Sequence, residues 1–384
     1  MAATPQSASA VEVIPVASES DWAAFFAVPE QIYHNDPHYV PPLRAEVERQ
    51  LSPQSSFLTY GQFEAFLAHQ DGQPVGRVVA SINHRLNQGQ DQKLGLFGYF
   101  ECIDDKAVSG ALFEAACRWL KEQGCSLVRG PVDLSTHIHC LCLVQGFDDP
   151  PTLRMPYNPS YYPGLIEAAG WAKAKDAIAY HYPMVLSHEA AFQRAHRHAC
   201  AMGVTFRPIR LKGAGFEVDC RSLHRVYSES FSDNWMSTPR TEAEFLEDAK
   251  GLRSIVDPKL FPIAEHDGRM IGFWMCLPDY NIPLRHVGGR LNAIGILKML
   301  WYRRQIHRAR VFALGVLPDY QRKRWAVAPA LIYLGVQGGN ARSRPFASAE
   351  LSWVWEDNQK SRSIIESSGG VPSKTYRLYE RSLD

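Results

Sequence analysis

The stretch of sequence that decides the fold is residues 261–277, which read FPIAEHDGRMIGFWMCL. Two runs rich in apolar residues, Phe261–Glu265 and Met270–Leu277, flank the tetrapeptide His266-Asp267-Gly268-Arg269. An Asp-Gly pair between two such runs is typical of a β-hairpin, because the residues of the tight turn must adopt positive φ angles. This stretch therefore predicts two neighbouring antiparallel strands.

The same pattern occurs in the first half of the chain. There, Phe63–His69 and Pro74–Asn83 flank the turn Gln70-Asp71-Gly72-Gln73. An apolar strand follows each hairpin, Leu94–Ile103 in the first half and Arg310–Val316 in the second. The recurrence suggests that the chain holds two copies of one structural unit.

A helix is expected after each of these strands. In the first half, apolar residues recur at helical spacing from Val108 to Leu120, and Gly124 is placed to end the helix. In the second half, Ala326–Val336 shows the corresponding pattern before Gly338 and Gly339. The order of elements is therefore the same in both halves.

The ends of the two halves also match. Residues 158–170 and 358–370 each run from an Asn through a short helical pattern to a Gly, and an alternating strand follows each, at 177–182 and 376–379. Repeated element order, hairpin turns and a closing Asn-to-Gly helix predict two copies of a β-β-β-α-β-α-β unit.

The length and charge balance agree with this organisation. The 384 residues exceed the size at which one core keeps growing, and 46% are hydrophobic, so two packed domains are expected. We place a disordered N-terminus at 1–10, a first domain at 11–185 and a second at 186–384. Lys and Arg number 41 against 40 Asp and Glu, which gives no global field for nucleic acid, so no nucleic-acid partner is expected.

Cysteine usage and the N-terminal sequence bear on the compartment. The eight cysteines are scattered without a C-x-x-C pair, as in reduced cytosolic proteins. The start, MAATPQSASA, has neither the basic nor the apolar region of a signal peptide, and no window approaches the run of about 18 apolar residues that crosses a bilayer. We expect a cytoplasmic protein, either free or peripheral on the inner membrane.

Residues 316–326 join the apolar strand of the second half to its helix and read VLPDYQRKRWA. They resemble the acetyl-CoA-binding motif of the GNAT acyltransferase superfamily, usually Gln/Arg-x-x-Gly-x-Gly/Ala. Gln321 and Ala326 match, whereas Arg324 stands where the first Gly is usual. In such a motif, backbone N–H groups at a helix N-terminus cradle the CoA pyrophosphate, helped by nearby cations. The resemblance implies acyl-CoA as cosubstrate, held by Val316, Gln321, Arg322, Lys323, Arg324, Trp325, Ala326 and, on the downstream helix, Asn358.

The resemblance covers nearly the whole chain. It implies an α/β (α+β) fold of two tandem GNAT-like domains, each a mixed, mainly antiparallel sheet flanked by helices. In the first half, the joint between strand and helix carries Asp104 and Asp105 where a phosphate would lie, and like charges repel. We therefore expect the second domain to bind acyl-CoA and the first to shape the acceptor site.

Further motifs narrow the resemblance. Six segments together resemble the tandem GNAT-like branch that includes the bacterial ceramide synthases, namely Phe100–Asp105, Arg129–Pro131, Met155–Pro159, Phe231–Trp235, Pro278–Asn281 and Glu356–Asn358. This implies an N-acyltransferase of lipid and sphingolipid metabolism that moves a long acyl group from acyl-CoA to the amine of a sphingoid-like base. An acyltransferase for a peptide side chain or polyamine, and a non-catalytic acyl-CoA-binding protein, stay open as alternatives.

Amide formation from a thioester needs a base for the amine proton and a proton for the leaving thiolate. Many GNAT enzymes use a strand Glu and a helix Tyr, and the positions that correspond here are Arg310 and Ile365. The second hairpin should place Asp279 near the start of the neighbouring strand, so we expect Asp279 to be the base, with capping of a turn as the alternative. Glu350 is the second candidate base. The hydroxyl of Tyr376 could protonate the thiolate, with simple packing as the alternative.

The stretch His137–Cys142, HIHCLC, has the composition of a metal site. If it is a strand, alternation places its His and Cys side chains on opposite faces, so four ligands do not converge and no metal is expected. This stretch lies in a loop, Val132–Pro151, that lengthens the first half. We expect the acceptor site to be lined by Ser135, His137, His139, Tyr157, Asn234, Trp235 and Asn281.

Residues 291–310, LNAIGILKMLWYRRQIHRAR, place apolar and aromatic side chains beside several cations. One interpretation is a buried helix that packs on the sheet and has a solvated cationic end. The other is contact with an anionic membrane surface, where an acceptor with apolar tails would be collected. Both interpretations stay open at this point.

Overall fold

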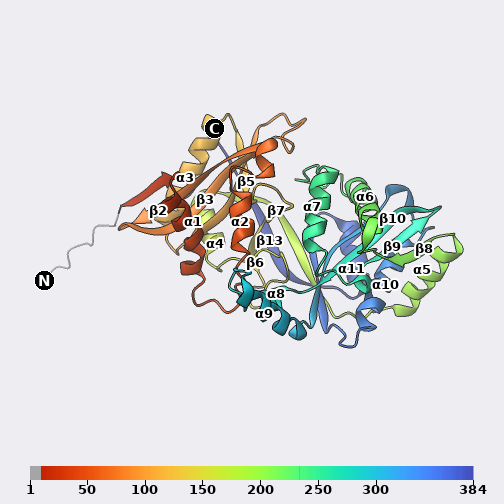
Figure 1. Cartoon of the computed structure of the whole chain (residues 1–384). Helices are drawn as coiled ribbons and strands as arrows, with labels where there is room; N and C mark the ends of the chain where they lie inside the picture. The colour runs from red at the N-terminus through yellow and green to blue at the C-terminus, as the bar shows by residue number, and fades with distance from the viewer. Residues whose placement is uncertain (1–9, 233, 384) are drawn as a thin grey trace. The chain divides into compact units, whose positions relative to one another are not determined.

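The computed structural model describes residues 10–232 and 234–383 (Figure 1). The expected disordered segment 1–10 lies, except for residue 10, outside the described residues. The chain forms two compact units. Unit 1 comprises residues up to 150, residues 156–176 and residues from 376 onward, and unit 2 comprises residues 151–155 and 177–375.

Unit 1 is built on a mixed sheet. Its strands follow one another in the order β1 (Val11–Pro15), β2 (Gly61–Gln70), β3 (Gln73–Asn83), β4 (Leu94–Cys102), β5 (Leu127–Gly130) and the C-terminal part of β13 (Val371–Ser382). Only the β4–β5 pair among these described strands is parallel. The predicted first hairpin is confirmed, with φ angles of 52° at Asp71 and 75° at Gly72.

The helices of unit 1 are α1 (Glu19–Ile32), α2 (Arg44–Gln50), α3 (Lys106–Glu122) and α4 (Tyr162–Ala168), with a short 3₁₀ turn η1 (Ser56–Thr59) and the short strand β6 (Cys142–Gln145). Helix α3 begins where Asp105 accepts hydrogen bonds from the N–H groups of Ala107 and Val108. As the helical spacing predicts, it buries Val108, Leu112 and Leu120, and it also buries Phe113, which lies outside that spacing. Asp105 is thus a helix cap.

Unit 2 has a second mixed sheet. Its strand order is β7 (Ala172–Tyr182), β12 (Ser348–Trp355), β11 (Arg308–Val316), β10 (Arg269–Pro278), β9 (Pro262–His266) and β8 (Thr205–Pro208). Strands β11 and β12 are parallel, and the other four pairs are antiparallel. The second predicted hairpin is also confirmed, with φ angles of 50° at Asp267 and 70° at Gly268.

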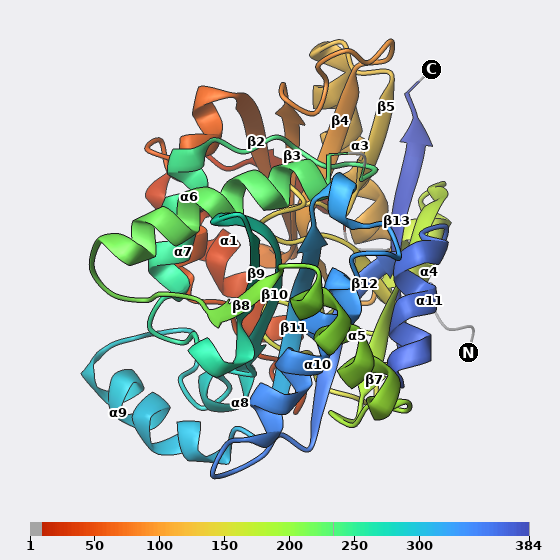
Figure 2. The same cartoon turned by 90° about the vertical axis from the view of Figure 1, so that its right-hand side faces the viewer.

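Helices cover this second sheet. They are α5 (Glu189–Ala201), α6 (Gly213–Ser230), α7 (Glu242–Leu252), α8 (Asn281–Leu284), α9 (Ala293–Tyr302), α10 (Val327–Asn340) and α11 (Gln359–Ser368), with 3₁₀ turns η2 (Pro258–Leu260), η3 (Arg303–Gln305) and η4 (Pro318–Tyr320). Helix α10 lies beside α5 and packs on β9, β10 and β11 (Figure 2).

The C-terminal end of α10 corrects one sequence expectation. Gly338 and Gly339 do not end the helix, which continues to Asn340. A Cβ atom at Gly338 would lie 1.8 Å from the carbonyl oxygen of Lys259, and one at Gly339 would lie 2.3 Å from the Met184 side chain. These glycines let the helix approach its neighbours closely, and that packing outweighs their low helix propensity.

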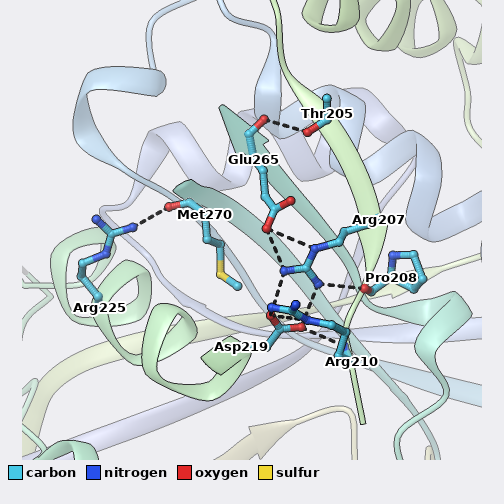
Figure 3. Close-up of polar contacts among 8 residues, drawn as sticks. All are labelled: Thr205, Arg207, Pro208, Arg210, Asp219, Arg225, Glu265 and Met270. Carbon is cyan, nitrogen blue, oxygen red and sulfur yellow. Dashed lines mark hydrogen bonds and ion pairs between the residues drawn. The ribbon is translucent and has the colours of Figure 1, made fainter. Parts of the chain in front are cut away.

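An ion-pair network fastens the edge strand β8 to the rest of unit 2 (Figure 3). The buried carboxylate of Asp219 on α6 accepts hydrogen bonds from Arg207 and Arg210, and Arg207 also donates to Glu265 on β9. Burial acts to raise the pKa of Asp219, but the hydrogen bonds from the two arginines outweigh it, so this pKa lies below its ordinary value. The network accounts for buried charge here without a catalytic role.

Each unit is completed by a strand from a distant part of the chain. Residues of β13 from Tyr379 onward pair with β5 in unit 1, and residues 177–182 of β7 pair with β12 in unit 2. The domain ranges 11–185 and 186–384 are drawn from the sequence repeat. Their assigned functions, shaping the acceptor site and binding acyl-CoA, stay predictions.

Candidate active site

In unit 2, strands β11 and β12 diverge. Parallel pairing joins Arg308–Val311 of β11 to Ser348–Leu351 of β12. On their other edges, β11 pairs with β10 from 309 to 316, and β12 pairs with β7 at 349–351 and 354–355. Among the residues that the structure describes, β11 and β12 share no later pair. Phe312 forms a bulge there, because Ala313 is opposite Met275 and Val311 is opposite Cys276. A bulge leaves a backbone group outside the ladder, where it can bind a ligand.

Strand β11 leads directly into the predicted cofactor loop. The Gln321 side chain folds back, and its Nε2 donates to the carbonyl oxygen of Val316, 2.9 Å away. Ala326 is the N-cap of α10 and has a left-handed conformation, with φ 53° and ψ 25°. Within the described chain no side chain caps this helix. The N–H groups of Val327 and Ala328 in its first turn therefore have no side-chain acceptor among the described residues, as an anion site requires, whereas Pro329 has no N–H.

The side chains around this helix start are suited to an anion. Arg322, Lys323 and Arg324 are all exposed, against one exposed carboxylate in the loop, Asp319. Trp325 packs inward, with its ring 4.8 Å from Tyr320 and 5.0 Å from His266. The loop thus presents three cations to solvent while Trp325 holds its backbone.

Asn358 lies at the start of the next helix, α11. Its Oδ1 accepts a hydrogen bond of 3.1 Å from the N–H of Ser361, which makes it the N-cap. The contact accounts for an Asn at this position through helix capping alone. A role for Asn358 in holding the cofactor stays a prediction.

The expected position of Asp279 is confirmed. Leu277 pairs with Arg310, and the N–H of Asp279 donates to the carbonyl oxygen of Arg308, at the start of β11. The carboxylate is 2% exposed, and its Oδ1 accepts from the N–H of Leu153 (2.9 Å) and of Asn281 (3.1 Å). The carboxylate of Asp279 therefore fixes segment 151–155 and the start of α8. This is the capping role that was given above as the alternative to base catalysis.

Asp279 also has an unusual acidity. Burial raises its pKa to about 6, although the positive charge of Arg308, whose Nε lies 3.5 Å from Oδ2, and two backbone hydrogen bonds oppose the shift. A carboxyl group that titrates near the working pH is suited to accept a proton and return it. Capping and base catalysis are compatible, because Oδ1 carries the caps.

Arg310 and Glu350 stand side by side in the parallel register of β11 and β12. Arg310 donates to Ser352 Oγ, at 2.8 and 3.2 Å from two of its nitrogens, and to the carbonyl oxygen of Leu153. Glu350 Oε2 lies 2.6 Å from the Nζ atom of Lys374, and both residues are buried. Lys374 was not proposed from the sequence as a site residue, because nothing in the sequence of strand 371–382 indicates that this lysine is buried.

The buried oxygens of unit 2 that lack a hydrogen-bond partner among the described residues include Glu350 Oε1. They also include the Thr152 hydroxyl, in the segment that contacts Asp279 and Arg310. Buried oxygens are nearly always hydrogen-bonded, and leaving one without a donor costs about 1–3 kcal/mol. Glu350 Oε1 is thus a buried acceptor without a donor among the described residues.

In unit 1 the corresponding opening is filled by the chain itself. Strands β4 and β5 pair over Leu94–Leu96 and then separate. The N–H of Val132 donates to the Phe97 carbonyl (2.7 Å), and Asp133 Oδ1 accepts from the N–H of Tyr99 (2.5 Å). The space between these strands is therefore occupied by residues 132–133, and the role of unit 1 stays a prediction.

The expected acceptor residues divide between the units. Ser135, His137, His139 and Tyr157 lie in unit 1, and Asn234, Trp235 and Asn281 lie in unit 2. Ser135 Oγ accepts from the N–H of His137 (3.3 Å), and His139 Nδ1 lies 3.5 Å from Asp133. The Tyr157 hydroxyl donates to Asp36 (2.7 Å), and burial together with this contact raises its pKa.

Of the three in unit 2, Asn281 is the most constrained. It donates from Nδ2 to the carbonyl oxygen of Pro151 (2.9 Å), so it helps Asp279 to hold segment 151–155. Trp235 lies edge-on to Trp355 with ring centroids 5.1 Å apart, and Asn234 is exposed. Tyr376 belongs to unit 1, where it is fully buried. Their roles toward substrate stay predictions.

The condition that residues 137–142 form a strand is not met. Residues 135–138 make a turn, with a hydrogen bond of 3.0 Å from the N–H of Ile138 to the carbonyl oxygen of Ser135, and β6 begins only at Cys142. The described residues contain no group of three or more His, Cys, Asp or Glu that could hold a metal ion.

Sequence reasoning missed one polar cluster, in unit 1. The Tyr162 hydroxyl donates to Glu101 Oε2 (2.6 Å), and Arg77 lies 3.9 Å from Oε1. The rings of Tyr33 and Tyr39 stack nearby at 3.7 Å. Burial raises the pKa of Glu101 against the opposing charge of Arg77. Glu101 was quoted from the sequence as part of a motif, but the sequence could not pair it with Arg77 and Tyr162, which come from distant segments of the chain.

Curated relatives cover nearly the whole chain. The bacterial ceramide synthase of Caulobacter vibrioides (strain NA1000 / CB15N) is 32% identical over 377 residues, which are 97% of this chain and 98% of that protein. Protein YghO of Escherichia coli (strain K12) is 32% identical over 371 residues, or 95% and 94% of the two chains. No family model matches the chain.

Solved structures match the fold. A tandem GNAT protein from the clavulanic acid biosynthesis pathway has a TM-score of 0.52 at 10% identity and covers 98% of this chain and 99% of its own. A GCN5-related N-acetyltransferase from Sphaerobacter thermophilus has a TM-score of 0.50 at 13% identity, with coverage of 97% and 96%. The chain has a tandem GNAT acyltransferase fold, and it belongs to the family that includes the bacterial ceramide synthase of Caulobacter vibrioides and protein YghO.

Proposed function

We propose that this protein is an acyl-CoA-dependent N-acyltransferase that moves a long acyl group to the amine of a sphingoid-like base. The observation that carries the proposal is the 32% identity to a bacterial ceramide synthase over 97% of this chain and 98% of that protein. The match extends over both halves of the chain.

In this proposal, unit 2 would hold the acyl-CoA. The uncapped start of α10 and the exposed cations at 322–324 would bind the pyrophosphate, whose charge favours a helix N-terminus. The divergence of β11 and β12 begins at Val311 and Leu351, next to this loop along the chain. The bulge at Phe312 would offer a backbone N–H to the thioester carbonyl, as an oxyanion donor.

The buried carboxylates would handle the proton of the amine. Asp279, with a pKa of about 6, is mostly ionised at neutral pH and is our leading general base. Glu350 is the second candidate, because its Oε1 has no donor among the described residues while Lys374 holds its Oε2. For the thiolate, Tyr376 stays the proposed proton donor.

Mass spectrometry of products tests this proposal. The full-length protein would be incubated with palmitoyl-CoA and, in parallel, a sphingoid base, its 3-keto form, or a polyamine of the same amine concentration. The expected result is an amide of one of the two long-chain amines and an equal amount of free CoA. Acylation of the polyamine alone would contradict the assigned acceptor, and release of CoA without any amide would contradict N-acyl transfer.

A further inference from the structure

Helix α9 and its flanks expose an unusual amount of apolar surface. Of the eleven large hydrophobic side chains that are exposed in the described chain, six lie between residues 291 and 301. The most exposed are Leu297 at 67%, Ile294 at 65% and Trp301 at 64%. Scattered apolar residues on a surface are normal, but a concentrated patch marks a binding site.

The structure overturns the interpretation of this segment as a buried helix. Gly295 is the one buried residue of α9, whose contacts are chiefly with α8 and η3. Figure 2 shows α9 in cyan outside the sheet, beside α8. The apolar side chains of α9 therefore have no sheet to pack on in unit 2.

The charges around this patch have one sign. No Asp or Glu occurs between residues 280 and 318. Five cations of the segment are exposed, namely Arg285, Arg290, Lys298, Arg303 and Arg304. The guanidinium of Arg304 lies 5.2 Å from the Trp301 ring, so cation and aromatic group are presented together. We define residues 285–304 as the α9 surface.

Two arginines that the sequence suggested for this surface do not belong to it. Arg308 and Arg310 lie on β11, where Arg308 contacts Asp279 and Arg310 is buried against Ser352. The cationic character of the surface thus comes from α9 and its flanking turns.

We propose that the α9 surface binds the face of an anionic lipid bilayer. Apolar and aromatic side chains interspersed with cations suit the boundary between headgroups and acyl chains. Each Lys or Arg near an anionic leaflet strengthens binding by roughly fivefold. No helix of the described chain is long and apolar enough to cross a membrane, so the contact is peripheral.

Charge argues against a second copy of this chain as the occupant. A twofold contact would bring the same patch of each copy together, and the five exposed cations would face five others with no acidic residue of the segment between them. An anionic bilayer neutralises these charges and buries the apolar side chains in one contact.

Vesicle flotation of the full-length protein tests the inference without reference to acyl transfer. We expect binding to vesicles of equal parts phosphatidylglycerol and phosphatidylcholine, weakening as salt is raised, and little binding to phosphatidylcholine alone. The double change Arg303→Glu and Arg304→Glu should weaken binding by more than about tenfold. Leu297→Glu with Trp301→Glu should abolish it.

Matched controls separate the α9 surface from general effects of charge. Arg118→Glu with Lys121→Glu reverses two exposed cations on α3, and Val218→Glu changes an exposed apolar residue on α6. Both controls should bind vesicles like the parent. Failure of the parent to bind, equal losses in the controls, or a concentration-dependent dimer in light scattering that the α9 variants dissolve would each overturn the inference.

Discussion

The substitution Asp279→Asn should change how the stability of the protein depends on pH. In the folded protein, burial raises the pKa of Asp279 from 3.8 to about 6, so the folded state holds this proton over a range in which the unfolded chain has lost it. Stability from this group is fully present below pH 3.8 and is lost as the pH rises through 6. An Asn at this position has no such titration.

The size of the effect follows from the shift. A difference of about two pKa units corresponds to about 3 kcal/mol, of which about 2 kcal/mol falls between pH 4.5 and 7.5. The parent protein should therefore lose about 2 kcal/mol of unfolding free energy relative to Asp279→Asn over this interval. The variant also loses hydrogen bonds, which lowers its unfolding free energy by a similar amount at every pH. This loss does not change the slope of its unfolding free energy against pH.

Urea denaturation at a series of pH values measures this difference, with unfolding followed by the fluorescence of the tryptophans. Asp91→Asn, a change at an exposed loop residue, is the matched control, and its curve should run parallel to that of the parent. Parallel curves for the parent and Asp279→Asn would refute the reasoning, since the carboxyl group would then titrate alike in both states.

Three further outcomes are expected. Asp279→Asn should lower turnover by about 10² or more with little change in the affinity for CoA. If its turnover is unchanged while Glu350→Gln loses turnover, Glu350 is the base instead. Changing the cations at 322–324 to Ala should weaken CoA binding in calorimetry about tenfold. Retained affinity would contradict the assignment of this loop as the CoA site. Ala326→Gly should raise the unfolding free energy by about 1 kcal/mol, because Gly tolerates the left-handed conformation, and a fall in stability would contradict this.

The fold could be predicted well because the turns that connect its strands are determined by local sequence. The Asp-Gly pairs at 71–72 and 267–268 specify hairpin turns through their own conformational preferences, and both turns form with positive φ. The pairing of Leu277 with Arg310 followed from strand order alone, and it located Asp279. Local rules failed at Gly338 and Gly339, where close contact with a distant segment decides the conformation.

The candidate site was only partly predictable, since its contacts join distant residues. Nothing near residue 279 in the sequence indicates that Leu153 donates to its carboxylate, or that Lys374 pairs with Glu350. The sequence showed that 291–310 combines apolar and aromatic residues with cations, but apolar residues are usually buried, and only the tertiary fold shows that these are exposed. The sequence repeat likewise could not show that residues 376–383 would join unit 1.

The most direct measurement uses palmitoyl-CoA labelled with carbon-13 in the acyl group and a sphingoid base labelled with nitrogen-15. If unit 2 holds acyl-CoA and the amine attacks its thioester, the mass spectrum should show one amide that carries both labels, and its formation should fall sharply in the variant with Ala at 322–324. A doubly labelled product formed equally by that variant would contradict the assigned CoA site. Free labelled fatty acid with no doubly labelled amide would contradict N-acyl transfer to a long-chain amine.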